Sequence, residues 1–138
     1  MPLGPKYDPK ENNVLVKTSL DPMVYLFSGK KLFKIDSESI FNKLNYSWSW
    51  IEKVNQSLIN QYQPTETINY IDHHLNYTLI KYPDTLEVYR LEPDPSDETK
   101  QVKRHIKDPQ TFNNLHFRWD RIVTISNTEV YESGVEIN

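Results

Sequence analysis

Residues 72–74, Asp-His-His, form the densest group of side chains in this sequence that could bind a metal ion. Adjacent histidines point to opposite sides of a strand and about 100° apart on a helix. A shared ion would therefore need loop geometry or a distant third ligand. We favour His73 and His74 as a solvated or connector-packed pair, and predict no metal site.

Catalytic chemistry has little support elsewhere in the chain. The absence of cysteine excludes disulfides, thiolate zinc sites and thiol catalysis, and three scattered glycines cannot form a phosphate-binding loop. His105 and His116 are unmatched in the other copy of the repeat described below, and no serine or aspartate partner is evident. Carboxylate pairs such as Asp97 and Glu98 lie in a polar stretch that would not raise a pKa. We expect no enzyme activity, no catalytic residues and no cofactor.

The composition is that of a polar but foldable chain. The 138 residues are 37% hydrophobic and 25% charged, with a net charge of -3 and nine tyrosines. No run of Lys or Arg suggests nucleic-acid binding. No apolar stretch approaches the length of a membrane span, and the N-terminus lacks a signal-peptide pattern. We therefore predict no nucleic-acid partner and no membrane insertion. Either the protein is used without export, or the sequence is that of a processed fragment.

The elements that must position these residues occur twice. Residues 14–27 align with residues 78–91, and residues 29–62 align with residues 100–133, giving ten identities over 48 positions. Chance would give about three. The second copy has seven extra residues near 92–98, which we interpret as an enlarged turn. The sequence therefore predicts an internal duplication.

Each copy has the pattern of a small mixed module. Residues 14–19, 23–27 and 31–35 read as strands, with a tight hairpin turn at 28–30. A capped helix follows near residue 36, or at Asp108–Pro109 in the second copy, and then a strand near 51–54. Capped turns at 55–57 and 126–128 should begin short helices carrying Ile59 and Val130. The predicted fold class is α+β: two tandem small modules, each a three- to four-stranded antiparallel sheet with one short helix and a terminal helical turn.

This duplication divides the chain into five parts. They are an extended Pro-rich arm at 1–13, repeat module 1 at 14–62, a connector at 63–77, repeat module 2 at 78–134 and a tail at 135–138.

Five aromatic and aliphatic positions shared by the two copies form the repeat-core signature of ten residues: Tyr25, Phe41, Leu44, Trp48, Ile51, Tyr89, Phe112, Leu115, Trp119 and Ile122. Trp48 and Trp119 are equivalent, which favours a packing role over ligand stacking. Trp50 has no counterpart and is a candidate partner contact. The arm and the enlarged turn supply the other candidate contacts: Tyr7, Pro93, Asp94 and Pro95.

The pattern of the first copy runs Leu-Val-Lys, Val-Tyr, Gly-Lys-Lys, Ile, Phe-Asn-x-Leu, Tyr-x-Trp and Ile-x-x-Val. The second copy fits it at 79–83, 88–89, 103–106, 108–109, 112 and 119–122. It resembles short modules found in tandem in bacterial and archaeal cell-surface and S-layer-associated proteins, and in some phage structural proteins. The resemblance covers nearly all of residues 14–133 and implies a surface or assembly role without catalytic residues.

Two departures from that family shape the functional expectation: the chain has no host domain and no export signal. Both favour a phage particle. We predict a non-catalytic structural protein of the virion, such as a decoration, connector or tail/neck accessory protein. Its partners would be other proteins of the assembly or copies of itself. The alternative is a cell-surface adhesive module that binds glycans through exposed Tyr and Trp.

Overall fold

A computed structural model describes residues 13–28, 31–64 and 66–138. They divide into two compact units, with the boundary between His73 and His74. We call the described residues up to His73 the N-terminal module, and those from His74 the C-terminal module. The described residues leave out most of the predicted arm, including Tyr7, and residues 29–30 of the predicted turn. No helix in the described part of the chain combines the length and apolarity that crossing a membrane requires.

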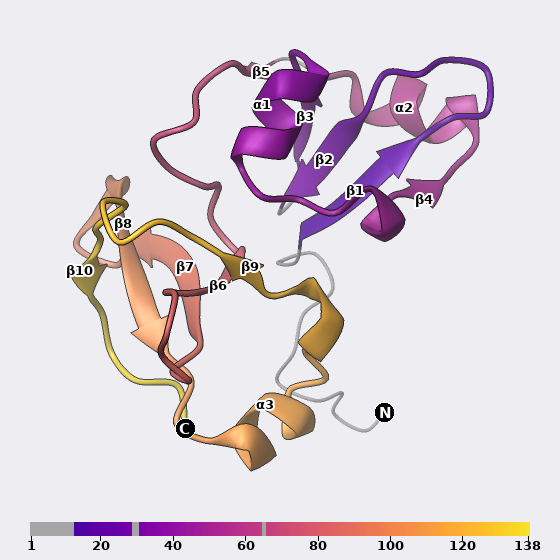
Figure 1. Ribbon diagram of the computed structural model, residues 1–138. Coiled ribbons are helices and arrows are strands. Elements are labelled where there is room, and N and C mark those ends of the chain that lie inside the picture. Colours follow the sequence, from indigo (N-terminus) through magenta and orange to yellow (C-terminus); the bar gives the residue numbers. More distant parts are fainter. Residues whose placement is uncertain (1–12, 29–30, 65) are drawn as a thin grey trace. The chain divides into compact units, whose positions relative to one another are not determined.

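The N-terminal module is built on a five-stranded sheet of order β4-β1-β2-β3-β5 (Figure 1). Its strands are β1 (Asn13–Lys17), β2 (Tyr25–Ser28), β3 (Lys31–Ile35), β4 (Glu52–Lys53) and β5 (Glu66–Ile68). The central three strands pair antiparallel, whereas both edge strands pair parallel to their neighbours. The sheet is therefore mixed.

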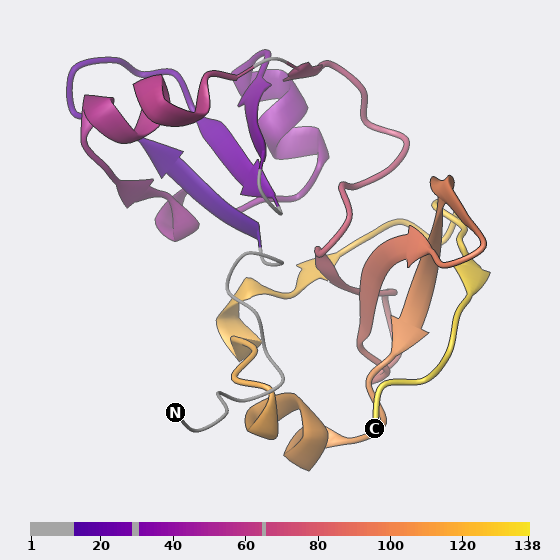
Figure 2. The same ribbon diagram turned by 180° about the vertical axis from the view of Figure 1, so that it is seen from behind.

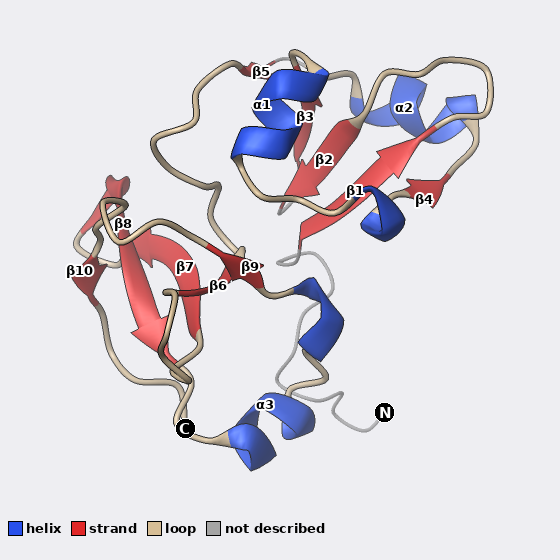
Figure 3. Ribbon diagram, in the orientation of Figure 1, coloured by secondary structure: helices blue, strands red, loops and turns tan. Residues whose placement is uncertain are grey.

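Three helical segments connect these strands: α1 (Glu38–Lys43), the 3-10 helix η2 (Trp48–Trp50) and α2 (Gln56–Tyr62). All three follow β3: α1 and η2 precede β4, and α2 lies between β4 and β5, as the colouring by secondary structure shows (Figure 3). Helix α2 buries Ile59 against Val16 and Leu32, because the apolar side chains of these strands need a cover on that face of the sheet.

The C-terminal module has a sheet of order β10-β8-β7-β6-β9. Its strands are β6 (Leu79–Lys81), β7 (Tyr89–Asp94), β8 (Asp97–His105), β9 (Val123–Thr124) and β10 (Glu132–Ser133). Between β8 and β9 lie α3 (Pro109–Asn114) and the 3-10 helix η3 (Trp119–Arg121). Figure 2 shows the long β7–β8 hairpin from behind.

The two modules share one topology. Read from its other edge, the C-terminal sheet has the order β9-β6-β7-β8-β10, which matches β4-β1-β2-β3-β5 strand by strand. The parallel pairing of Val16 with Glu52 recurs as that of Ile80 with Val123, at the residue numbers that the sequence alignment predicts. The structure confirms an α+β fold with two sheet modules. Each sheet, however, has five strands and is mixed, because the segment that follows the first helix supplies two parallel edge strands.

The seven extra residues of the second copy do not form an enlarged turn. They lengthen the hairpin: β7 continues through Asp94, β8 begins at Asp97, and only residues 95 and 96 lie between them. A register shift between Pro93 and Asp94 accommodates the odd number of extra residues. Pro93 and Asp94 therefore belong to a strand, and the prediction of a loop here was wrong.

The ends of the predicted parts also differ from the structure. Strand β5 lies inside the stretch interpreted as a connector, and it adds an edge to the first sheet. Residue Ile137 of the interpreted tail bridges to Ile106, and its backbone nitrogen donates to the His105 carbonyl at 2.8 Å. Gly134 lies close to β8, where a Cβ would meet a Val102 methyl at 2.8 Å.

The terminal helix forms in only one module. Residues 126–128 make a turn without a helix, and Val130 is 77% exposed, whereas its counterpart Ile59 is 4% exposed. The prediction of a helix carrying Val130 was wrong. One residue earlier, Glu129 aligns with Leu58 of the first copy, and its buried carboxylate is hydrogen-bonded to His74 and Tyr131.

Candidate functional site

Trp48 is held rigidly although it is half-exposed. One face of its indole packs against the buried Phe41, with ring centroids 4.1 Å apart and an angle of 32° between the planes. The indole nitrogen donates to the Asn42 side-chain oxygen at 3.0 Å. The residue nevertheless remains 46% exposed. The ring therefore both packs within the module and offers surface to solvent.

Trp119 repeats this arrangement in the C-terminal module. Its ring centroid lies 4.0 Å from that of Phe112 at an angle of 30°, and its nitrogen donates to the Asn113 oxygen at 2.7 Å. It is 49% exposed. The predicted equivalence of the two tryptophans thus extends to their packing partner, hydrogen bond and exposure.

The backbone that brings each indole onto its helix is also the same. Ser37 and Asp108 are extended N-cap residues whose side chains accept from the backbone nitrogens of Ile40 and Thr111. The hydrogen bond from Thr111 lowers the pKa of Asp108. After each helix, Asn45 and His116 adopt left-handed φ values of 63° and 61°. Asparagine and histidine tolerate this conformation better than most residues, so the chain can turn back.

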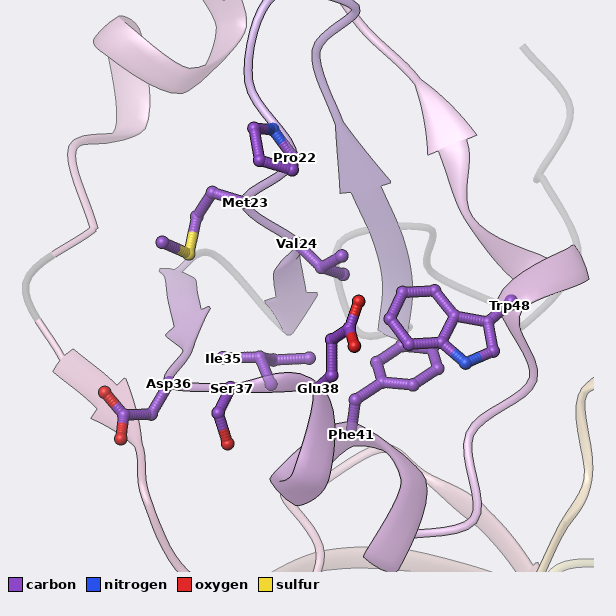
Figure 4. A pocket seen from close by; sticks show the side chains of 9 residues that line it. All are labelled: Pro22, Met23, Val24, Ile35, Asp36, Ser37, Glu38, Phe41 and Trp48. Carbon is purple, nitrogen blue, oxygen red and sulfur yellow. The ribbon is translucent and has the colours of Figure 1, made fainter.

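A pocket of about 260 Å³ lies beside Trp48 in the N-terminal module (Figure 4). Its apolar lining comes from Met23, Val24, Ile35, Phe41 and Trp48. Polar groups come from the start of α1, and Figure 4 shows the Glu38 carboxylate between Val24 and Trp48. The backbone nitrogen of Met23 donates to the Asp21 side chain at 2.9 Å, which stabilises the turn before this part of the lining.

The polar rim of this pocket is acidic and is not neutralised. Asp36 and Glu38 are both exposed, and neither makes an ion pair with any residue in the described ranges. In the C-terminal module, Lys107 and Pro109 occupy the corresponding positions. The two modules therefore share the indole but differ in the charge beside it.

The Asp-His-His group does not converge on one point. The ring nitrogen Nδ1 of His73 lies 2.8 Å from an Asp72 oxygen, a contact that lowers the pKa of Asp72, and the ring stacks on Tyr70. His74 is instead 3% exposed. Over the residues that the structure describes, no three histidine or carboxylate side chains are grouped to hold a metal ion.

His74 is the centre of a buried polar network that sequence reasoning missed. Its Nδ1 lies 2.6 Å from a Glu129 oxygen, and its backbone nitrogen donates to the Tyr131 hydroxyl at 2.9 Å. That hydroxyl also donates to Glu129, and the Tyr82 hydroxyl donates to the Glu129 carbonyl at 2.7 Å. Burial, followed by the hydrogen bond with Glu129, raises the pKa of Tyr131 well above its usual range. The enclosed network is suited to holding residue 74 and the segment at 129–131 together.

A second cluster joins charge to aromatic rings in the same module. Arg90 is 7% exposed, and its guanidinium lies 5.0 Å from the ring centre of Tyr77 and 5.5 Å from that of Phe117. Glu92 accepts from Arg90 at 2.6 Å and from Arg104 at 2.9 Å. The equivalent position in the first copy is the buried Leu26, so an arginine at that place in the repeat could have indicated the cluster.

The predicted partner contacts are dispersed rather than gathered into one site. Trp50 is half-buried, Pro93 and Asp94 are half-buried in β7, and Pro95 is exposed at the turn. The signature residues Phe41, Leu44 and Phe112 are each 1% exposed. The other seven members of the signature are less buried. Five of them are half-buried, Tyr25, Ile51, Tyr89, Leu115 and Ile122, and Trp48 and Trp119 are half-exposed.

No protein-family model, no curated protein and no solved structure matches this chain. The functional argument therefore depends on the geometry of the two modules.

Proposed function

We propose that this chain is a non-catalytic assembly protein, a component of a phage virion, that acts through protein–protein contacts. The observation that carries the proposal is the pair of half-exposed indoles, Trp48 and Trp119, at equivalent positions in two modules. Each indole packs against a phenylalanine ring, and its nitrogen donates a hydrogen bond to an asparagine side chain.

Such residues suit contact surfaces for energetic reasons. Tryptophan is enriched among the few residues that supply most of the binding energy of protein interfaces. A ring that is already held by packing and a hydrogen bond loses little conformational entropy when a partner covers it. Two such rings on one chain would also allow two-point attachment, which increases overall affinity.

The proposal is tested on virus particles purified from the source of this sequence. Mass spectrometry of the particles should detect the wild-type chain, and the double variant Trp48→Ala/Trp119→Ala should be depleted from them at least about tenfold. Val135→Ala removes a side chain from a residue that is 74% exposed and serves as the matched control. Circular dichroism establishes that each variant is folded. A chain that is absent from particles and sediments as a monomer at all concentrations would refute the proposal.

Glycan binding is the second candidate function, because the same half-exposed rings could stack on sugar rings. A glycan array probed with the wild-type chain, Trp48→Ala, Trp119→Ala and Trp50→Ala separates the two functions. Binding to defined glycans that is lost in the variants of the exposed rings would favour the adhesive function. An array without signal, together with recovery from particles, would favour assembly.

A further inference from the structure

We propose that the pocket beside Trp48 binds an arginine side chain of a partner protein, an inference that rests on the proposed function. The pocket is lined by residues of the N-terminal module. Its size, its apolar lining and the charge on its rim each restrict what can occupy it.

The size of the pocket favours a single side chain. Its volume of about 260 Å³ is below the range of about 300–1,000 Å³ typical of sites for small-molecule ligands. Val24, Ile35 and Phe41 line the interior with apolar atoms. An arginine stem of three methylene groups would bury apolar surface against them.

The rim determines the charge of the occupant. Glu38 places its carboxylate between Val24 and Trp48, whereas the second acidic residue of the lining, Asp36, lies beyond Ser37 and points its carboxylate away from Trp48 (Figure 4). Both carboxylates are exposed and make no ion pair within residues 13–28, 31–64 or 66–138. A cation is therefore complementary to the rim, whereas an acidic or phosphorylated segment would be repelled.

Arginine fits better than lysine for a geometric reason. A guanidinium is planar, so it can stack on an indole face while its N–H groups donate to a carboxylate. Trp48 and Glu38 both line the pocket and supply these two groups. The compact ammonium of a lysine would pair with Glu38, but its interaction with the Trp48 indole would be less favourable.

The C-terminal module provides an internal comparison. Trp119 has the same packing, hydrogen bond and exposure as Trp48, but Pro109 replaces Glu38 and Lys107 replaces Asp36. Glu87 stands in the place of Met23, and the Asp108 carboxylate is engaged as the cap of α3. The carboxylate beside the indole is thus replaced by a proline ring, and arginine should not bind there.

The test uses the full chain and N-acetyl-L-arginine amide as the probe. Nitrogen-15 NMR follows the indole N–H signals, which are assigned with Trp48→Phe and Trp119→Phe. We expect a saturable shift of the Trp48 signal and no shift of the Trp119 signal. N-acetyl-L-citrulline amide, which has nearly the same shape without the charge, should bind at least about threefold more weakly.

Three variants sharpen the test. Glu38→Gln should weaken binding of the probe about threefold to tenfold, whereas Glu98→Gln, which removes the same charge from an exposed residue of β8, should leave it unchanged. The double variant Lys107→Asp/Pro109→Glu should create an arginine response at Trp119. Circular dichroism establishes that all three variants are folded.

Several results would overturn the inference: no shift at Trp48, equal binding of citrulline, equal response of Trp119, tighter binding of N-acetyl-L-lysine amide, or a larger shift with methyl glycosides. Failure here is distinguishable from failure of the proposed function. If the probe does not bind but Trp48→Ala is still depleted from particles, assembly stands and the arginine assignment falls. If the probe binds but particles lack the chain, the assembly function falls.

Discussion

Some side-chain arrangements in this protein occur in both modules, and others occur in one module only. The stacked pair of tryptophan and phenylalanine and its asparagine hydrogen bond occur twice with nearly the same geometry. The His74 network and the Arg90 cluster occur only in the C-terminal module, where polar and charged residues replace the aliphatic Leu58 and Leu26 of the first copy. Buried polar residues are stable only when their hydrogen bonds are satisfied, so these clusters depend on complete partner sets.

Tyr131→Phe tests the His74 network through its pH dependence. The pKa of Tyr131 is raised above 10.0 in the folded chain, so the unfolded chain loses this proton first as the pH rises. Stability from Tyr131 is therefore complete below pH about 10 and is lost above it. The variant should be about 1–3 kcal/mol less stable at pH 7, because two hydrogen bonds are lost. The difference in unfolding free energy between the variant and the wild type should become smaller above pH 10.

Urea unfolding at pH 7 and pH 10.5 measures this difference. Tyr62→Phe, which changes an exposed tyrosine of α2, is the matched control and should alter stability little at either pH. A stability gap for Tyr131→Phe that stays constant or widens above pH 10 would contradict the buried network.

At the scale of elements, the two modules share a strand order but differ in the segment that follows the fourth strand. In the N-terminal module, α2 covers one face of the sheet with Ile59 and brings Tyr62 against Phe27 at a centroid distance of 4.6 Å. In the C-terminal module, the corresponding segment forms a turn, and Glu129 and Tyr131 bond to His74 instead. The second copy has also extended its hairpin into a long two-stranded arm.

The pair Ile59→Ala and Val130→Ala tests this difference at aligned positions. Ile59 is 4% exposed, so its truncation should cost about 2–5 kcal/mol of unfolding free energy through lost burial and a cavity. Val130 is 77% exposed, and its truncation should change stability by less than about 0.5 kcal/mol. Urea denaturation followed by circular dichroism measures both. Equal losses at the two positions would mean that the second module also covers its sheet with this residue.

At the scale of the whole molecule, each module has its own sheet and its own core. The cluster of Val16, Leu32 and Ile59 lies in one module, and that of Val88, Ile106 and Phe112 lies in the other. Domains of about 60 residues are marginally stable because they bury a limited fraction of their surface. A substitution that destabilises one core should therefore lower the unfolding free energy mainly of its own module.

Amide hydrogen exchange of the Ile59→Ala variant tests this independence. We expect faster exchange in β1, β2 and β3, because opening of the N-terminal module becomes less costly. Exchange in β7 and β8 should match that of the wild-type chain. Val130→Ala serves again as the control. Uniform acceleration in both sheets would show that the modules unfold as one cooperative unit.

Local sequence signals were sufficient to predict the duplication, the α+β class, the first helix of each module and the equivalence of Trp48 with Trp119. These features depend on periodicity, capping residues and self-similarity, which are properties of short segments. A strand was predicted at the place of β4 and β9, but its parallel pairing at the sheet edge was not, because that pairing is defined only by the neighbouring strand. Strands β5 and β10, of two or three residues each, were beyond such reasoning for the same reason. The same holds for the enclosure of His74 by Glu129, which lies 55 residues away, and for the pocket beside Trp48. Contacts between distant segments decide burial, and burial decides whether a histidine is a ligand, a solvated side chain or part of a core.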